Sequence, residues 1–272
     1  MEINLNGSTL FYKKTGSGVE PLLLFHGFGM DHSAFTSIAE ALSAQFTCYS
    51  FDLFFHGKSS WNNGEAPLSM QTWSLIMAQF FQTERITRFS VLGYSIGARF
   101  ALGTFMAFPA QTSRLILLAP DGIKDNFWYK LAVYPLLTRM IFRQMIQRPF
   151  LFNSLSRISA RAMVVHPALL RFAASQMSTT EKREKVYKTW VVFRHLRFKP
   201  MELIKKINDS DCQVVIYLAT QDRMIKRNFL ESFAASLKNC RLSVLNTSHH
   251  QLIADVATVL PGDLTSQNGS RR

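Results

Sequence analysis

Cysteine is scarce in this chain of 272 residues, which contains only Cys48, Cys212 and Cys240. An odd number of widely spaced cysteines is a poor disulfide framework, and no C-x-x-C pair suggests a zinc or redox motif. No group of histidine and acidic residues has the spacing of metal ligands, and no G-x-G-x-x-G motif follows an early strand. We therefore expect reduced thiols, a cytoplasmic location, no metal and no cofactor.

Long apolar runs are also missing. No stretch of about 18 uninterrupted apolar residues occurs, so the sequence predicts no transmembrane helix. The first residues lack a basic segment followed by an apolar one, which argues against a secretory signal. Hydrophobic residues nevertheless make up 47% of the chain and charged residues 18%, which suffices for a full core. We expect one main domain with a smaller insertion, either soluble or peripheral to a membrane.

Acidic residues are almost absent from residues 123–200, where fifteen Lys and Arg face only Asp125, Glu181 and Glu184. This segment therefore carries twelve of the thirteen net positive charges of the chain. Its interleaved aromatic and basic residues show no clear strand pattern, which predicts a helical insertion. A basic amphipathic surface suits an anionic membrane or an anionic substrate, and a merely solvated face is the third interpretation. No nucleic-acid-binding module is recognisable, so nucleic acid is not an expected partner.

Outside this segment, short apolar runs alternate with helical spacing. Strands are predicted at residues 9–13, 21–25, 46–51, 88–92, 114–119, 213–219 and 241–245, and helices at 31–43, 69–80, 96–108, 227–237 and 251–260. This alternation predicts an α/β fold with a mostly parallel, doubly wound sheet covered by helices on both faces. The predicted organisation is a core of residues 1–122 and 201–262, a basic helical cap of residues 123–200, and a polar tail of residues 263–272.

One motif carries a recognisable chemistry. Gly93-Tyr94-Ser95-Ile96-Gly97 fits the pattern G-x-S-x-G and lies between a predicted strand and a predicted helix. Such a turn is so sharp that only small residues fit two positions before and two after the serine. The serine then sits at a helix N-terminus, whose dipole favours developing negative charge. An ordinary Gly-Ser turn is the alternative, and the strand–turn–helix context favours a nucleophile.

Four further features accompany this serine. His26–Gly29 follows a strand as in an H-G-x-G loop, and Asp52–Ser59 is similar to a D-x-x-G-x-G-x-S loop in which Phe55 replaces the first glycine. Asp222 follows a later strand, and Ser248–His250 lies near the C-terminus in place of a G-H pair. With these motifs, residues 9–260 resemble the α/β-hydrolase superfamily, in particular members with a helical cap inserted after the sixth strand. The resemblance implies the chain order Ser, Asp, His of a catalytic triad.

The resemblance also implies the role of each residue. Ser95 would attack a carbonyl carbon, His249 would accept the serine proton and later donate one to the leaving group, and Asp222 would orient that histidine. The backbone N–H groups of Phe28 and Ile96 would bind the oxyanion.

Two of these assignments have alternatives. His249 follows a small residue, as the catalytic histidine of the family usually follows glycine, but His250 stays open as the base. Asp121, which follows an earlier strand, is the alternative acid, although its place in the strand order fits the triad less well. His26 and His56 are expected to be structural residues of their loops.

The predicted function is a serine hydrolase that cleaves a carboxylic ester or related acyl bond of a small-molecule substrate, which is expected to be anionic or lipid-like. The same triad could serve C–C bond hydrolysis, thioester hydrolysis, acyl transfer or lyase chemistry, since the fold alone does not choose the reaction. A non-catalytic ligand-binding protein of the same fold is the other class of function.

Overall fold

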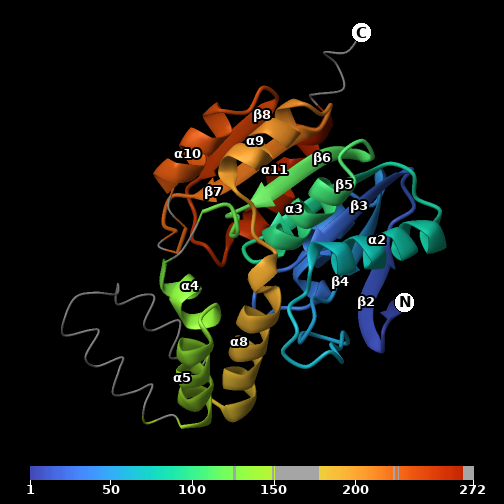
Figure 1. Ribbon diagram of the computed structural model, residues 1–272. Coiled ribbons are helices and arrows are strands. Elements are labelled where there is room, and N and C mark those ends of the chain that lie inside the picture. Colours follow the sequence, from blue (N-terminus) through green and yellow to red (C-terminus); the bar gives the residue numbers. More distant parts are fainter. Residues whose placement is uncertain (125–126, 149, 151–177, 223, 226, 266–272) are drawn as a thin grey trace. The chain divides into compact units, whose positions relative to one another are not determined.

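The computed structural model describes residues 1–124, 127–148, 150, 178–222, 224–225 and 227–265 (Figure 1). The chain divides into two compact units. The first unit comprises Met1–Asn63, Ser69–Lys124 and Leu196–Arg272, and the second comprises Gly64–Leu68 and Asp125–His195. Part of the predicted cap, residues 151–177, and most of the predicted tail lie outside the described residues.

The first unit is built on an eight-stranded sheet. Its strands are β1 (Glu2–Leu5), β2 (Ser8–Thr15), β3 (Glu20–Phe25), β4 (Phe46–Phe51), β5 (Phe89–Tyr94), β6 (Thr112–Leu118), β7 (Gln213–Ala219) and β8 (Cys240–Leu245). They lie in the order β1-β2-β4-β3-β5-β6-β7-β8, and the pairs from β4 to β8 are all parallel. The predicted α/β fold with a mostly parallel sheet is confirmed.

Strand β1 was not among the predicted strands. It pairs with β2 in antiparallel fashion at the edge of the sheet and buries little besides Ile3, so its sequence has no apolar run. The hairpin turns at Asn6 and Gly7, which have φ angles of 50° and 74°. Two consecutive positive φ angles are typical of a type I′ turn, whose twist matches that of the strands it joins.

Helices of the first unit cover both faces of the sheet (Figure 1). They are η1 (His32–Phe35), α1 (Thr36–Ala41), α2 (Met70–Glu84), α3 (Gly97–Ala107), α9 (Pro200–Asn208), α10 (Arg227–Ala235) and α11 (Leu252–Thr265). The predicted helix cap at Ser69 is confirmed, because its hydroxyl accepts a hydrogen bond from the Thr72 amide at 3.0 Å. The predicted helix over 31–43 is instead a short 3₁₀ turn followed by a helix that ends at Ala41.

The central strands are buried on both faces, which is why they read as short apolar runs. Leu22 and Leu24 of β3 belong to the cluster that includes residues of α1 and α11. The alternate residue Phe25 points the other way and packs on Trp73 of α2 and Phe100 of α3, with ring centroids 5.6 and 6.0 Å apart. The alternation of side chains along each strand thus supplies two core layers from one sequence run.

The C-terminal helix extends beyond the predicted core. Helix α11 runs to Thr265, whereas the sequence pattern predicts a polar tail from residue 263. Leu264 is buried, and Asp263 accepts a hydrogen bond from the Tyr217 hydroxyl and pairs with Arg241 at 2.7 Å. The polar residue therefore belongs to the helix because its partners come from β7 and β8.

The described part of the second unit is helical. It contains α4 (Phe127–Val133), α5 (Leu136–Gln147), α8 (Thr180–Val192) and η2 (Phe193–His195). Helices α5 and α8 pack through Phe142, whose ring centroid lies 5.3 Å from that of Tyr187 and 5.7 Å from that of Trp190. The buried Arg183 guanidinium donates to the carbonyl of Ile146 at 2.7 Å, which satisfies a group near the end of α5.

The second unit also takes in Gly64–Leu68, which the sequence pattern assigned to the core. The Leu68 amide donates to the Val192 carbonyl at 2.8 Å, and the Tyr187 hydroxyl donates to the Glu65 carboxylate at 3.1 Å. The residues of each pair are more than 120 positions apart in the chain, so a local sequence pattern could not predict these contacts.

In the part of the chain that the structure describes, no helix is both long and apolar enough to cross a membrane. The three cysteines are free thiols.

Candidate active site

Ser95 occupies a strained turn between β5 and α3. Its φ angle is 52°, a left-handed conformation that L-residues other than glycine rarely adopt. Its amide donates to the Leu118 carbonyl at 2.9 Å, and its carbonyl accepts from the Asp121 amide at 3.1 Å. Hydrogen bonds from β6 and the loop after it therefore hold the serine in this conformation, and its side chain remains partly exposed.

The two glycines of the motif are required by close backbone approaches. A Cβ atom on Gly93 would lie 2.6 Å from the Cα of Ala98, and one on Gly97 would lie 2.0 Å from the carbonyl oxygen of Phe25. Both distances are far below van der Waals contact, and the neighbouring atoms belong to backbone that cannot move aside. The spacing of the motif thus follows from the packing of α3 against β3 and β5.

His249 and Asp222 form a buried pair. The Nδ1 atom of His249 lies 2.6 Å from Oδ2 of Asp222, and both side chains are more than nine-tenths buried. Because a carboxylate only accepts, Nδ1 carries the proton and Nε2 is left as an acceptor. Burial raises the pKa of Asp222, but hydrogen bonds from His249 and from the amides of Met224 and Ile225 outweigh burial and hold this pKa below its ordinary value.

The topology brings this pair to the same edge of the sheet as Ser95. Asp222 follows β7 and His249 follows β8, and the carboxyl ends of the parallel strands β5 to β8 share one edge. Tyr94, the residue before the serine, donates its hydroxyl hydrogen bond to the His249 carbonyl at 2.9 Å, and the two rings lie 5.2 Å apart. Within the described residues, the Ser95 hydroxyl itself forms no hydrogen bond.

The two alternative residues are placed differently. His250 is exposed, whereas His249 is buried on the Asp222 carboxylate. Asp121 is engaged by the buried Arg99 of α3, with Nη2 and Nε of the guanidinium 2.7 and 2.9 Å from Oδ2. Of these two acids, the one that contacts a histidine is therefore Asp222.

Two backbone amides near the serine have no acceptor among the described residues. They belong to Phe28, in the loop after β3, and to Ile96, directly after the serine. An oxyanion hole requires such unpaired donors, because an amide already bonded to the protein cannot also bind a developing charge. The Ile96 amide lies at the start of α3, where the helix dipole adds to the attraction.

Two buried histidines hold the loop that carries Phe28. His26 accepts from the Leu53 amide through Nε2 at 3.0 Å and contacts the Gly27 carbonyl through Nδ1 at 2.7 Å. His56 accepts from the Gly29 amide at 3.0 Å and contacts the Phe54 carbonyl at 3.0 Å. Each ring joins the loop after β3 to the loop after β4 through backbone groups, in line with the structural role expected for both.

The buried position of His26 makes the stability of the fold depend on pH. Burial lowers the pKa of His26 to about 4, so this ring is neutral in the folded protein. Since the unfolded chain binds the proton near pH 6.5, the stabilisation is complete above that pH and is lost as the pH falls from 6.5 through 4. The shift corresponds to about 3 kcal/mol.

We expect His26→Gln to be less stable than the wild type at pH 7, because its amide cannot replace both ring contacts. The difference in unfolding free energy should shrink by about 3 kcal/mol on acidification to pH 4, because only the wild type loses the histidine contribution. Urea unfolding of both proteins at the two pH values measures it. A difference that stays constant would show that His26 does not titrate between the two states.

The contacts of Asp52 could not be predicted from the sequence pattern. This buried carboxylate accepts from the His32 amide at 2.6 Å, from the His32 ring at 2.9 Å and from the Lys58 amide at 2.8 Å. A Cβ on Gly57 would lie 2.0 Å from its Oδ2 atom. Phe55 adopts a φ of 69° at the position where the resemblance places a glycine, so the loop keeps the glycine conformation without the glycine.

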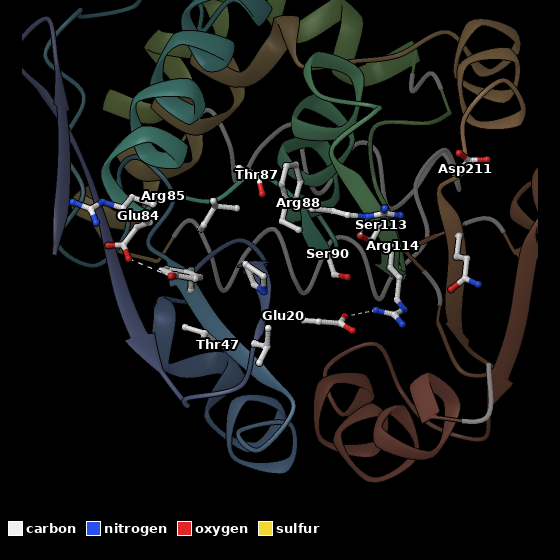
Figure 2. Close-up of a pocket in the computed structure, with 16 residues that line it drawn as sticks. Glu20, Thr47, Glu84, Arg85, Thr87, Arg88, Ser90, Ser113, Arg114 and Asp211 are labelled. Atoms are coloured by element: carbon white, nitrogen blue, oxygen red, sulfur yellow. Dashed lines mark hydrogen bonds and ion pairs between the residues drawn. The ribbon is translucent and has the colours of Figure 1, made fainter. Parts of the chain in front are cut away.

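A cavity of about 580 Å³ opens at the opposite edge of the sheet, at the amino ends of the strands (Figure 2). An ion pair between Glu20 and Arg114 lies on one side, and the Arg88 Nε donates to the Ser113 hydroxyl at 2.7 Å. Ser90, at the start of β5, lines this cavity and lies five positions before Ser95, or about 16 Å along an extended strand. None of the predicted site residues lines it.

Ser90 in this cavity supplies a prediction on stability. Its hydroxyl is buried and has no hydrogen-bond partner among the described residues. A buried hydroxyl without a partner costs about 1–3 kcal/mol, so we expect Ser90→Ala to raise the free energy of unfolding by about 1 kcal/mol. Chemical denaturation measures the change.

Ser113→Ala is the matched control for this prediction, because it removes a hydroxyl of the same cavity that does have a partner. It should lower the free energy of unfolding by about 1 kcal/mol. Destabilisation by Ser90→Ala of the same size would show that the Ser90 hydroxyl is satisfied after all.

With this geometry in hand, the family of the chain is established. Residues 20–255 match the model of the α/β hydrolase fold family, and the chain belongs to that family. Among curated proteins, it is 29% identical over 164 residues to the pimeloyl-[acyl-carrier protein] methyl ester esterase of Edwardsiella ictaluri, a match that covers 57% of this chain and 60% of that protein. It is 27% identical over 127 residues to the 1-acylglycerol-3-phosphate O-acyltransferase ABHD5 of Rattus norvegicus, covering 43% and 34%. The chain thus matches less than two thirds of the length of either relative.

Solved structures share the fold over nearly the whole chain. A thermophilic esterase from Thermogutta terrifontis superposes with a TM-score of 0.71 at 18% identity, covering 98% of both chains. The enol-lactonase from Burkholderia xenovorans LB400 gives a TM-score of 0.69 at 17% identity, covering 97% of this chain and 100% of that one. At this level of identity the likeness establishes the fold.

Proposed function

We propose that this chain is a serine hydrolase that cleaves a carboxylic ester or a related acyl bond through an acyl-enzyme. The observation that carries the proposal is the buried hydrogen bond of 2.6 Å between His249 and Asp222. Asp222 follows β7 and His249 follows β8, at the edge of the sheet where the strained serine follows β5. A histidine with one nitrogen bound to a carboxylate and the other left as an acceptor is the arrangement of a general base.

The chemistry assigned to these groups follows from that arrangement. Ser95 Oγ attacks the carbonyl carbon while Nε2 of His249 takes the hydroxyl proton, and the Asp222 carboxylate stabilises the imidazolium that forms. The same proton then passes to the leaving alcohol or amine as the tetrahedral intermediate collapses. A water molecule then attacks the acyl carbon while His249 takes its proton. The histidine returns this proton to Ser95 Oγ as the carboxylic acid leaves.

The oxyanion is assigned to the amides of Phe28 and Ile96, which have no acceptor among the described residues. Removal of one such donor costs about 3 kcal/mol of transition-state stabilisation in a serine hydrolase. The His26 and His56 contacts support this role, because they fix the loop whose amide must meet the developing charge.

The substrate is proposed to be a small-molecule acyl compound that is anionic or lipid-like. The names of two relatives describe different reactions, since one is a methyl ester esterase and the other an acyltransferase. Thioester hydrolysis, C–C bond hydrolysis, acyl transfer and lyase chemistry use the same serine and histidine, so the reaction has to be separated by substrate.

A fluorophosphonate probe tests the nucleophile independently of the substrate. We expect it to label the folded wild-type chain at Ser95, as located by peptide mass spectrometry, and to leave Ser95→Ala unlabelled. Labelled protein then justifies a panel of esters and thioesters of increasing chain length, with and without an anionic group. Folded protein that resists the probe would identify the chain as a non-catalytic member that only binds a ligand.

A further inference from the structure

Helix α5 has two apolar faces. Phe142 and Ile146 point inward and are buried within the second unit. The other side of the helix carries four large apolar residues, Leu136, Leu137, Met140 and Ile141. Each residue advances 100° around the helix axis, so these four share one face that lies opposite Phe142 and Ile146. We call these four residues the outer face of α5.

The outer face is unusually exposed for large apolar side chains. Leu136 and Leu137 are 64% and 71% exposed, and Met140 and Ile141 are 58% and 53% exposed. Single apolar residues are common on protein surfaces, but four on one helical face form a contiguous patch that needs a partner. Leu131, Tyr134 and Phe150, just before and after this helix, are also exposed.

Positive charge lies along one side of these apolar side chains and after the last turn of the helix. Arg139 and Arg143 border the outer face on one side by helical spacing, and the exposed Arg148 follows the last turn. In the part of the chain that the structure describes, neither Arg139 nor Arg148 is paired with a carboxylate. Helix α5 itself contains no acidic residue, and the basic segment around it carries nearly all the net charge of the chain.

We propose that the outer face of α5 binds the surface of an anionic lipid membrane. In this arrangement the helix lies in the plane of the interface, with its leucines among the upper acyl chains and its arginines beside the lipid phosphates. A protein partner would have to bring both an apolar groove and a matching acidic rim, whereas an anionic bilayer supplies both everywhere on its surface. The proposal concerns binding alone and does not depend on chemistry at Ser95.

Vesicle co-sedimentation of the full chain tests the proposal. We expect the protein to pellet with vesicles of phosphatidylcholine and phosphatidylglycerol in equal amounts, to stay in solution with phosphatidylcholine alone, and to be released as salt is raised. Equal binding to both vesicles, or to neither, would overturn it.

Two double variants, each compared with a matched control, test whether the outer face makes the contact with the vesicle. Leu136→Ser with Leu137→Ser should weaken vesicle binding about a hundredfold, about tenfold for each leucine. Leu75→Ser with Met201→Ser is the matched control, since it removes two exposed apolar side chains outside the second unit and should leave binding unchanged. Arg139→Gln with Arg148→Gln should weaken binding about thirtyfold, against a small effect of Lys205→Gln with Lys206→Gln.

Melting temperature and oligomeric state exclude the other occupants of the face. We expect the leucine variant to have the same melting temperature as the wild type, and both proteins to be monomers by light scattering. A lower melting temperature with unchanged vesicle binding would show that the chain itself covers the face. Loss of a wild-type dimer would show that a second copy does, and either result would overturn the proposal.

Discussion

Replacement of Ser95 by alanine is expected to lower kcat for an ester substrate about 10⁶-fold, with little change in KM. The loss is this large because the serine, the histidine and the acid act as one unit, so that removal of the nucleophile removes the benefit of all three. Steady-state kinetics on the best ester of the panel measures it. Activity above the uncatalysed rate would remain through binding and the oxyanion donors.

The alanine variant must be shown to be folded, since Ser95 lies in a strained turn. Alanine lacks only the hydroxyl, and the backbone bonds to Leu118 and Asp121 do not involve the side chain. The unfolding transition should therefore match that of the wild type within about 1 kcal/mol. Ser90→Ala, on the strand that leads to Ser95, is the kinetic control and should retain full activity. A Ser95→Ala protein with wild-type kcat would exclude serine catalysis in this chain.

Replacement of His249 by alanine is the second large effect, and the neighbouring His250 supplies its control. We expect His249→Ala to lose about 10⁶-fold in kcat, because His249 is the group proposed to take the serine proton. His250→Ala should stay within a few fold of the wild type, since His250 is exposed and the contact with Asp222 is made by His249. Both variants are assayed with the same substrate at the same pH.

Asp222→Asn completes this comparison. The amide keeps the size of the side chain but favours the wrong tautomer of the histidine, for which a loss of about 10⁴-fold is expected. Asp121→Asn should leave kcat nearly unchanged, because Asp121 is held by Arg99. If His250→Ala or Asp121→Asn were the inactive variant, the base or the acid would have to be reassigned.

Most of the fold could be predicted from the sequence because its central strands are buried on both faces. Runs such as Pro21–Phe25 and Gln213–Ala219 are short, apolar and bounded by turn residues, which leaves few alternatives. Strand β1 escaped prediction because an edge strand needs to bury only one residue, here Ile3. The end of α11 was not predicted because Asp263 is polar, and its partners Tyr217 and Arg241 are distant in the sequence.

The candidate site divides in the same way. The turn at Ser95 could be predicted because close backbone approaches require both of its glycines, and the five residues of the motif contain the whole pattern. The order of the strands favours Asp222 over Asp121 as the acid, but the ion pair that holds Asp121 could not be predicted, because Arg99 comes from a different element. Sequence motifs identify the candidate catalytic residues, but tertiary contacts between distant elements determine which of them interact.

The hydrogen bond from the Tyr94 hydroxyl to the His249 carbonyl has a consequence for local unfolding. Loops after strands ordinarily open with little cost and exchange their amide hydrogens quickly. Here the loop that holds the histidine is tied, through a buried tyrosine, to the strand that leads into the serine turn. The loop cannot swing out without breaking a bond to the middle of the sheet, so its amides should exchange on the slow timescale of the core strands. Hydrogen–deuterium exchange measured for the amides that follow β8 would test this expectation.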